Sequence, residues 1–355
     1  MTVFWSILIA VLVFGFLIMI HEFGHYTVAR WCGITIDEFS IGMGPKIFGK
    51  KSQKTGTLFS LRALPIGGYV SMVGEQEESD AEGSFSKKNV WQRIAVVVAG
   101  ATMNLIIGFV IVFVIVCIAA ASGKIATTTI ADFQKEATSS QEGGLQLGDT
   151  VIKVGNVRVH TGEELTYEIT NQGDKPIDLT VIRNGEKQVL EQVQFPTSVD
   201  SGITFGSYDF YVLALKDPGF FDLIKHSFWR STSLIKMVWD SLYNLIVGKY
   251  GVAQLSGPVG VTAAVADTVA NSNWNGMQIL NYALNITSLI SINLGVFNLI
   301  PFPALDGGRL FFLLIEAVTK KRIPADIEAK INFGGMMLLM ALMFFVVCKD
   351  IVNLF

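Results

Sequence analysis

The chain consists of long uncharged runs on either side of a polar middle segment. Four runs contain no Asp, Glu, Lys or Arg, and each is close to the roughly 20 residues that a helix needs to cross a bilayer. The first run lacks the basic start and small-residue cleavage site of a secretory signal, which predicts a retained helix. We therefore expect a polytopic α-helical membrane protein with four transmembrane helices, at residues 2–20, 94–122, 281–300 and 331–347.

Basic residues gather in two of the loops between these runs. Because short cytoplasmic loops accumulate Lys and Arg, the loops after the first and third runs are predicted to be cytoplasmic. Both termini and the long middle segment would then face the other side of the membrane. The basic residues are Arg30, Lys46, Lys50, Lys51, Lys54, Arg62, Lys87, Lys88 and Arg93 in the first loop, and Lys320, Lys321, Arg322 and Lys330 in the second.

Two β-prone stretches lie in the first cytoplasmic loop, at residues 34–41 and 57–70, and Gly and Pro turn signals bound them. They predict a membrane-associated β-hairpin or small sheet on the cytoplasmic side. A structured loop that only joins two helices is the alternative, and the sequence does not separate the two.

The polar middle segment is predicted to hold a β-rich module at residues 124–199. A helix is expected at 163–171, and a strand at 177–182 ends at a turn signal, Arg183-Asn184-Gly185. Farther on, residues 220–247 place apolar side chains at helical spacing between charged ones. Such an amphipathic segment suits helices at the outer membrane surface, or a helix packed on the module or on the spans.

Composition narrows the functional classes. Hydrophobic residues make up 51% of the chain and charged residues only 16%, where an average soluble domain has roughly a quarter. The net charge of -3 gives no basic excess, so a nucleic-acid-binding protein is set aside. Cys32, Cys117 and Cys348 are isolated, which predicts neither a disulfide framework nor a cysteine metal site.

The first run ends in His21-Glu22-Phe23-Gly24-His25. If the helix continues, both imidazoles lie on one face and can bind one zinc ion, with Glu22 beside them as a general base. HExxH also occurs by chance in long helices, and chance placement at the membrane interface is the alternative. Three ionisable groups at the end of a charge-free span are costly, however, and such residues mark a functional site by default.

A catalytic zinc ion needs a third protein ligand and an open position for water. The other two histidines, His160 and His226, lie in the outer segment, so a carboxylate is expected as the third ligand. Spans one and three run in the same direction, and His21 and Asp306 both arrive near the cytoplasmic boundary. Prolines and glycines interrupt the helix next to this Asp, which makes it the candidate.

These residues resemble the site-2 protease family of intramembrane zinc metalloproteases, which combines HExxH with an Asn-x-x-Pro-x-Pro-x-Leu-Asp-Gly stretch on a later helix. This chain matches every fixed position of that stretch between Asn298 and Gly307. Segments at 42–45, 64–70 and 255–260 are also similar to family segments, so the resemblance covers most of the chain. The chain is most similar to the bacterial regulator-of-sigma proteases, and the length of its middle module fits a single PDZ domain.

The resemblance implies zinc as the cofactor, His21, His25 and Asp306 as its ligands, and Glu22 as the catalytic base. Zinc would polarise the scissile carbonyl and activate a water molecule. Glu22 would take a proton from that water and return it to the leaving nitrogen.

Substrate contacts are expected at two places. Asn298 on the interrupted third span, with Pro301 and Pro303, is a candidate oxyanion or substrate-binding group. An Asn that only caps helix carbonyls is the alternative. A peptide bond in a transmembrane helix must unwind before cleavage, and an exposed strand edge around residues 57–70 would pair with the unwound segment.

The implied activity is the second, site-2 cleavage of single-span membrane proteins such as anti-sigma factors, or of signal-peptide remnants, in the lipid bilayer of a bacterial cell. The PDZ-like module would bind C-terminal peptides or hinder bulky substrates, and a spacer without a ligand is its alternative. Two other functions remain open, a zinc-binding transporter or sensor and a PDZ scaffold without turnover. Glu22 separates hydrolysis from transport, because only hydrolysis needs a base between the two histidines.

The expected organisation has four parts. Residues 1–122 hold the first two transmembrane helices, HExxH and the cytoplasmic β-loop, and residues 123–200 form one extracytoplasmic PDZ-like β-sandwich domain. Residues 201–275 form an amphipathic extracytoplasmic connector. Residues 276–355 hold the last two transmembrane helices and the third metal ligand. The active site is expected near the cytoplasmic face of the cell membrane.

Overall fold

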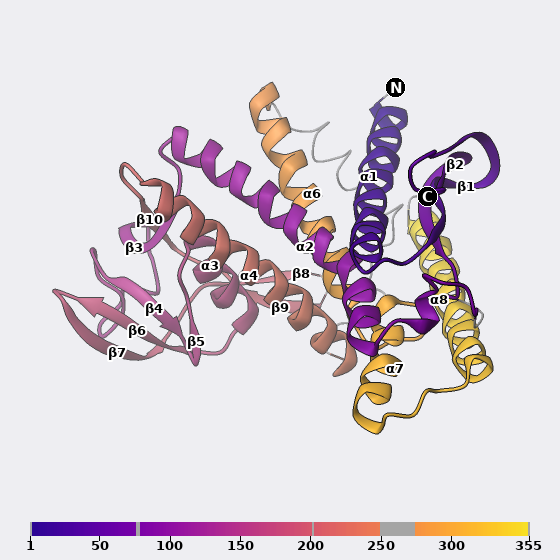
Figure 1. The fold of residues 1–355 in the computed structure, drawn as a ribbon. Helices are drawn as coiled ribbons and strands as arrows, with labels where there is room; N and C mark the ends of the chain where they lie inside the picture. Colours follow the sequence, from indigo (N-terminus) through magenta and orange to yellow (C-terminus); the bar gives the residue numbers. More distant parts are fainter. Residues whose placement is uncertain (1, 76–78, 201, 249–273, 354–355) are drawn as a thin grey trace. The chain divides into compact units, whose positions relative to one another are not determined.

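Long apolar helices form the framework of the chain in a computed structural model, which describes residues 2–75, 79–200, 202–248 and 274–353. Among these residues, four helices have the length and composition of membrane spans, and each coincides with one of the uncharged runs. The prediction of four membrane-spanning helices is confirmed to this extent. The helices are α1 (Thr2–Trp31), α2 (Val90–Ala121), α6 (Gly276–Asn298) and α8 (Ala325–Asn353) (Figure 1).

Helix α1 continues well past its uncharged run and ends in a Schellman motif. The Ile34 N–H donates to the Ala29 carbonyl at 2.9 Å, which closes the last turn. Gly33, at the turn, has φ +67°, a conformation that glycine adopts without steric cost. The HExxH residues therefore lie inside one continuous helix.

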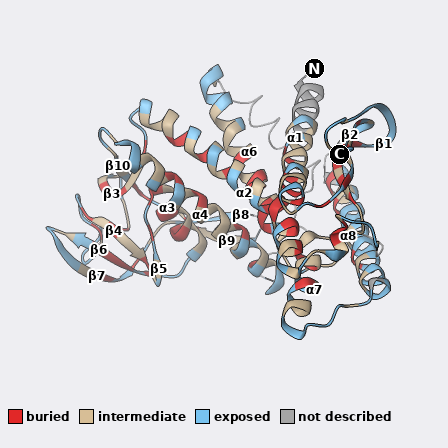
Figure 2. Ribbon diagram, in the orientation of Figure 1, coloured by how far each residue is buried: buried red, intermediate tan, exposed pale blue. Residues whose placement is uncertain are grey.

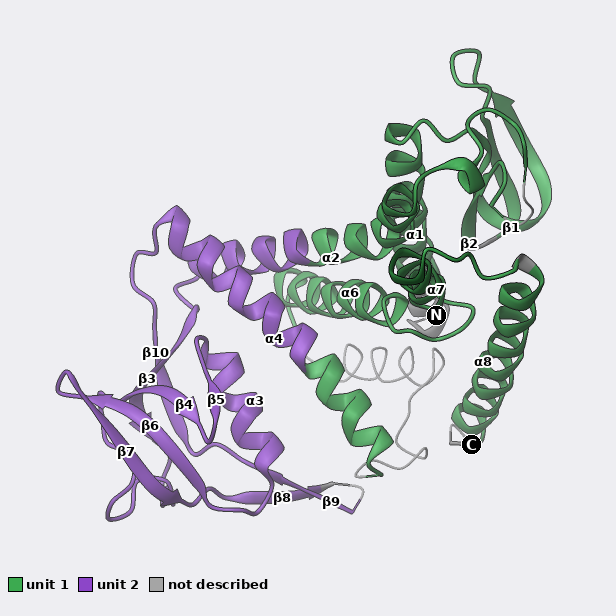
Figure 3. Ribbon diagram, turned by 60° about the horizontal axis from the view of Figure 1, so that its bottom comes forward, with its two compact units in different colours: residues 1–108, 237–355 green, residues 109–236 purple. Residues whose placement is uncertain are grey.

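The chain divides into two compact units (Figure 3). Residues 1–108 and 237–355 make up the first, here called the helical unit, and residues 109–236 make up the second, the β unit. Helix α2 contributes to both units, and so does α4 (Phe220–Ile246).

The helical unit contains an antiparallel hairpin of β1 (Ile36–Lys51) and β2 (Leu58–Met72), as predicted for the first loop. Both strands bend, so the hairpin folds back on itself. Ser60 pairs with Gly49 on one side and with Ser40 on the other, and Ser40 pairs in turn with Tyr69. The bent strands therefore lie in the order 46–51, 58–64, 36–43 and 68–72.

This register corrects the expected substrate edge. Residues 58–61 are paired on both sides, so the prediction of an open edge was wrong for them. In the described part of the chain, strand 68–72 pairs only with residues 36–41, and its other edge is open. Propensity along the chain could not show this, because the fold-back depends on pairing between the two strands.

A buried apolar cluster joins the hairpin to the helices of this unit (Figure 2). It contains Phe39 and Val70 of the hairpin, Ala29 of α1 and Val96 of α2. It also contains Leu313 of α7 (Asp306–Thr319), a helix after the third span that the sequence pattern did not single out.

The β unit is built around a sheet with strand order β10-β3-β4-β6-β7, and β5 pairs with β4. The predicted helix and the predicted strand at 177–182 are both present. Two further strands, β8 and β9, form a separate pair. The elements are β3 (Ala126–Phe133), β4 (Thr150–Val154), β5 (Val157–Arg158), α3 (Gly162–Gln172), β6 (Ile177–Arg183), β7 (Glu186–Val193), β8 (Thr197–Asp200), β9 (Ile203–Gly206) and β10 (Phe210–Ala214).

The core of the β unit lies between α3 and this sheet. Leu165 and Ile169 of α3 are fully buried against strand residues that include Leu179 and Val181. Phe210 of β10 belongs to the same core, so the sheet of this module continues past residue 200.

The first part of α4 packs on α3 within the β unit. Arg230 Nη1 lies 3.1 Å from Glu163 Oε1, and the rings of Trp229 and His160 stack with centroids 3.5 Å apart. This part of the amphipathic segment thus packs on the module through Trp229 and Arg230, and its placement at the membrane surface stays a prediction. The similar segment at 255–260 lies outside the described residues.

Candidate metal centre

Three side chains of the helical unit converge on one point. His21 and His25, one turn apart on α1, have Nε2 atoms 3.1 Å apart. Asp306, the first residue of α7, places its Oδ2 atom 3.0 Å from His21 Nε2 and 3.2 Å from His25 Nε2. The structure therefore brings together the three residues expected to bind zinc, and both histidines are buried.

The donor set fits a zinc ion. Two imidazole nitrogens and one carboxylate oxygen make up a ligand set of catalytic zinc sites, which keep a fourth position for water. Ligand atoms around tetrahedral zinc stand about 3.3–3.5 Å from one another, close to the 3.0–3.2 Å found here. Asp306 Oδ2 is buried and accepts no well-formed hydrogen bond within the described chain, so an ion would satisfy it.

A tight fold-back after α6 brings Asp306 to the histidines. A Cβ atom on Gly307 would stand 2.1 Å from the Ile300 carbonyl oxygen, and one on Gly308 would stand 2.4 Å from that of Phe302. Only glycine tolerates such an approach of backbone to backbone. The Asp-Gly-Gly sequence therefore supplies the expected carboxylate ligand and permits the turn that positions it.

The other predicted residues of the third span lie at different distances from the centre. Asn298 Nδ2 is 3.5 Å from His21 Nδ1, so this amide borders one of the two converging histidines. Pro303 packs against α8, where a Cβ atom on Gly335 would stand 2.5 Å from the proline Cβ. Pro301 is exposed. The structure thus places only Asn298 of these three next to the ligands.

Glu22 lies against the hairpin at Gly68, the first residue of the strand whose other edge is open. Its side chain is half-buried, and a Cβ atom on Gly68 would stand 3.5 Å from Glu22 Cγ. The same Cβ would stand 2.8 Å from the Ser40 carbonyl oxygen. Strand 68–72 therefore passes the expected catalytic base at its glycine.

Helix α2 supplies a layer behind the histidines that the sequence analysis did not identify. Val96, Gly100 and Asn104 follow one another at four-residue spacing, so they share one face of the helix. The Val96 carbonyl oxygen lies 2.8 Å from His25 Nδ1, and Asn104 Nδ2 lies 3.4 Å from His21 Nδ1. The signal in the sequence was a Gly and an Asn four residues apart in an apolar run, since a polar amide is costly there.

Arg309 makes a second set of contacts that the sequence did not predict, and these hold the start of α7. Arg309, one turn after Asp306, donates from Nη2 to the Glu75 carbonyl at 2.8 Å and pairs with the Glu75 carboxylate. Its guanidinium also lies 4.7 Å from the centre of the Phe85 ring. The start of α7 is thereby tied to the segment that follows β2.

Comparisons with known proteins agree with this geometry. The family model of Peptidase family M50 matches residues 9–342. A provisionally named zinc metalloprotease of Clostridium acetobutylicum is 35% identical over 98% of both chains. Zinc metalloprotease RasP of Bacillus licheniformis is 28% identical over 99% of both chains. The chain therefore belongs to Peptidase family M50, the site-2 protease family, and is a membrane zinc metalloendopeptidase.

Proposed function

We propose that this enzyme cuts single-span membrane proteins, such as anti-sigma factors or signal-peptide remnants, and performs the second, site-2 cleavage of regulated intramembrane proteolysis. One observation carries the proposal. His21 and His25 stand on a helix long and apolar enough to span a membrane, and Asp306 completes the ligand set from α7. Ionisable side chains are costly inside a membrane-spanning helix, and where they occur they mark a functional site at that depth.

The roles of the residues follow from their positions. His21, His25 and Asp306 would hold the zinc ion, which supplies a Lewis acid for the scissile carbonyl and for a water molecule. Glu22 accepts a proton from the attacking water and passes it to the leaving nitrogen. Asn298, whose Nδ2 atom is 3.5 Å from His21 Nδ1, is placed to hold the substrate backbone or the developing oxyanion.

Zinc analysis and a cleavage assay on the same purified variants test these roles. Glu22→Gln should keep its zinc and lose about 100- to 10,000-fold in turnover, the usual contribution of a general base. His25→Ala should lose zinc and turnover together. Full activity of Glu22→Gln would remove the base from the mechanism and favour ion transport. Inactive His25→Ala that still binds zinc would contradict the ligand assignment.

The unwound substrate segment is proposed to lie along the open edge of strand 68–72. This strand begins at Gly68, next to Glu22, whereas residues 58–61 are already paired on both sides. An extended peptide can add to an open edge through backbone hydrogen bonds, which also compensate the bonds lost from its helix.

Photo-cross-linking in the Glu22→Gln background tests this placement. A cross-linking amino acid at Ser71, on the strand with the open edge, should capture a single-span substrate. The matched control is Lys50, on the opposite outer strand of the same hairpin. Equal capture from both positions, or capture only from Lys50, would contradict the proposed edge.

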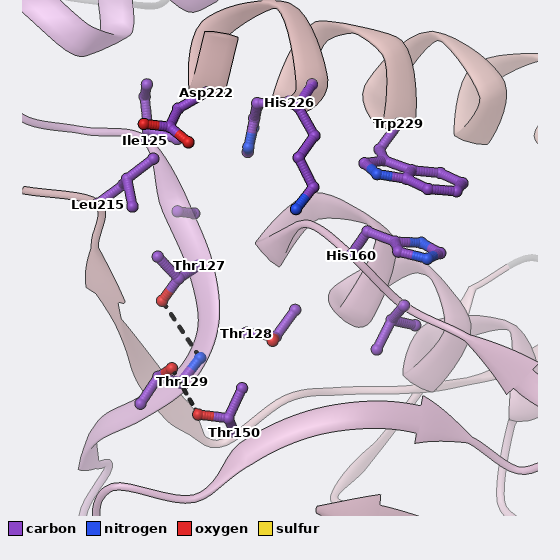
Figure 4. Close-up of a pocket in the computed structure, with 13 residues that line it drawn as sticks. Ile125, Thr127, Thr128, Thr129, Thr150, His160, Leu215, Asp222, His226 and Trp229 are labelled. Carbon is purple, nitrogen blue, oxygen red and sulfur yellow. Dashed lines mark hydrogen bonds between the residues drawn. The ribbon is translucent and has the colours of Figure 1, made fainter. Parts of the chain in front are cut away.

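A second binding function is proposed for the β unit, as a PDZ-like module that takes a C-terminal peptide. A pocket of about 320 Å³ lies between β3 and α4 (Figure 4). Thr128 on β3, which is 8% exposed, lines it together with Lys225 and His226 of α4. The Thr128 hydroxyl and the Lys225 ammonium group can bind a carboxylate, whereas the Asp222 carboxylate, which also lines the pocket, would oppose one.

Binding of labelled peptides to the full chain tests this function. A peptide with a free C-terminus should bind, and its C-terminal amide should bind several-fold more weakly. Lys225→Gln should remove most of that difference. Equal binding of acid and amide would exclude carboxylate recognition, and absence of binding would favour a spacer.

A further inference from the structure

The Nδ1 atom of His21 faces two side-chain amides. Asn104 Nδ2 lies 3.4 Å away on α2, and Asn298 Nδ2 lies 3.5 Å away at the end of α6. A half-turn of either amide exchanges its nitrogen and its oxygen at nearly the same positions. Whether His21 Nδ1 carries a proton therefore decides whether an amide oxygen or an amide nitrogen faces it.

A neutral histidine that binds a metal through Nε2 carries its remaining proton on Nδ1, and that proton needs an acceptor. His25 meets this requirement, because its Nδ1 lies 2.8 Å from the Val96 carbonyl oxygen. His21 also presents Nε2 to Asp306, at 3.0 Å. Its Nδ1–H must therefore donate, and only an amide oxygen, not an amide nitrogen, can accept.

The two asparagines differ in what else they can do. Asn104 is fully buried, and in the described part of the chain its side-chain oxygen has no hydrogen-bond partner. Its backbone carbonyl accepts from Ser291 Oγ at 2.7 Å, which ties this turn of α2 to α6. Asn298 is half-buried and ends its helix. Asn104 is thus confined to the histidine, whereas the Asn298 amide can reach a substrate.

We propose that Asn104 is a positioning residue that accepts the Nδ1 proton of His21 through its side-chain oxygen. This contact fixes the tautomer that leaves Nε2 free for zinc, and it leaves the Asn298 amide to donate to the substrate. The inference rests on His21 as a zinc ligand. Helix α2 then orients both histidines, His25 through the Val96 carbonyl and His21 through Asn104, one on each side of Gly100.

Zinc affinity of the full chain in detergent, measured by competition with a chelator, tests the proposal. Asn104→Leu removes the acceptor at similar volume and should weaken zinc binding about 10- to 100-fold, as is typical when a partner of a metal-bound histidine is lost. Asn104→Asp keeps an acceptor oxygen and should bind zinc at least as tightly as the wild type. Ser291→Ala, which removes only the contact to the Asn104 backbone, is the matched control and should keep wild-type affinity.

Two further measurements separate orientation from packing. In the zinc-loaded protein the His21 Nδ1–H should give a ¹H–¹⁵N signal that is protected from exchange with water in the wild type and in Asn104→Asp, and that exchanges faster in Asn104→Leu. Asn298→Leu should lose turnover and keep zinc affinity.

Three results would overturn the proposal. The first is wild-type zinc affinity in Asn104→Leu, and the second is an equal loss in the Leu and Asp variants, which would indicate packing alone. The third is weakened zinc binding in Asn298→Leu but not in Asn104→Leu, which would make Asn298 the acceptor. If His21→Ala retains zinc, the ligand assignment itself fails, so this failure is distinct from a failure of Asn104.

Discussion

At the scale of single residues, one position that faces both histidines has no side chain. A Cβ atom on Gly100 would stand 2.3 Å from His25 Nε2 and 2.8 Å from His21 Cε1. Gly100→Ala must therefore displace the ligand atoms, because contacts below about 3 Å cannot be accommodated in a close-packed interior. We expect the zinc content of the purified variant to fall and its turnover to drop by at least 100-fold.

The control for this substitution is Gly334→Ala on α8, where a Cβ atom meets nothing within 4 Å. It introduces the same methyl group into an apolar helix and should leave zinc content and turnover unchanged. Normal zinc content in Gly100→Ala would mean that α2 can move away from the histidines, contrary to the packing described here.

The convergence of His21, His25 and Asp306 could be predicted from the sequence, whereas the contacts that support them could not. His21, Glu22 and His25 follow from spacing along one helix, and Asp306 from its interrupted span. The contacts of Val96 and Asn104 depend instead on how α2 packs against α1. That packing is set by a close approach, since a Cβ atom on Gly24 would stand 2.4 Å from the Ala99 carbonyl oxygen.

At the scale of elements, one carboxylate holds the folded hairpin together. Glu38 on strand 36–43 accepts hydrogen bonds from Ser60 at 2.5 Å, Arg62 at 2.9 Å and Tyr69 at 2.8 Å. Ser60 and Arg62 lie on strand 58–64, and Tyr69 lies on strand 68–72, so Glu38 joins both strands that neighbour its own. Glu38→Ala should leave zinc content unchanged and speed amide hydrogen exchange in residues 68–72. Turnover should fall about tenfold, which corresponds to the free energy of one hydrogen bond to a charged group.

Asp37→Ala is the matched control, because this neighbouring acid is exposed. The contribution of Glu38 should also depend on pH. Burial works against its charge, but hydrogen bonds from Ser60, Arg62 and Tyr69 outweigh burial and lower its pKa. The stabilisation is therefore complete above the ordinary value of 4.5 and is lost as the pH falls below it. Identical exchange in both variants would contradict this role.

The contact between α3 and α4 rests on a second carboxylate. Burial disfavours the charge on Glu163, but the His226 ring, whose Nε2 lies 3.7 Å from Glu163 Oε2, and the charge of Arg230 outweigh burial and lower the pKa of Glu163 to about 2. Its contribution is present in full above pH 4.5 and is lost as the pH falls toward 2. Because this carboxylate is partly exposed, solvent screening keeps the contribution below about 1 kcal/mol.

Hydrogen exchange at neutral pH measures this contact. Glu163→Gln should speed exchange in residues 220–236 by a few-fold and leave the strands of the β unit unchanged. Glu186→Gln, at the exposed first residue of β7, removes an acid from the β unit and should have no effect. Unchanged exchange in Glu163→Gln would show that ring stacking and apolar contacts alone hold the helix.

The elements themselves could be predicted where local signals agree. The helix at 163–171 shows apolar spacing and a capping Thr161, whose hydroxyl accepts from the Glu164 N–H at 3.2 Å. The turn after β6 places Asn184 and Gly185 at positive φ, as a tight hairpin requires. The fold-back of the first hairpin and helix α7 were missed, because both depend on contacts between residues far apart in the chain.

At the scale of the whole molecule, the orientation of the protein in the membrane is predicted from the distribution of its basic residues. The four spans could be predicted, because each needs only a local run of apolar residues. Their orientation follows from the basic residues of the first and third loops, which predict that the hairpin is cytoplasmic and the β unit extracytoplasmic. The metal centre belongs to the same unit as the hairpin, so the orientation also predicts the side on which a cleaved fragment is released.

Cysteine labelling in intact cells tests this topology. In a background without Cys32, Cys117 and Cys348, single cysteines replace Lys187 on β7 and Lys54 in the turn between β1 and β2, two exposed positions. A membrane-impermeant maleimide that reaches the outer surface of the cell membrane should label Lys187→Cys at once, and Lys54→Cys only after permeabilisation. The reverse order of labelling would place the metal centre on the outer side of the membrane. A fragment released there could not carry a signal into the cytoplasm, so this result would contradict the site-2 role.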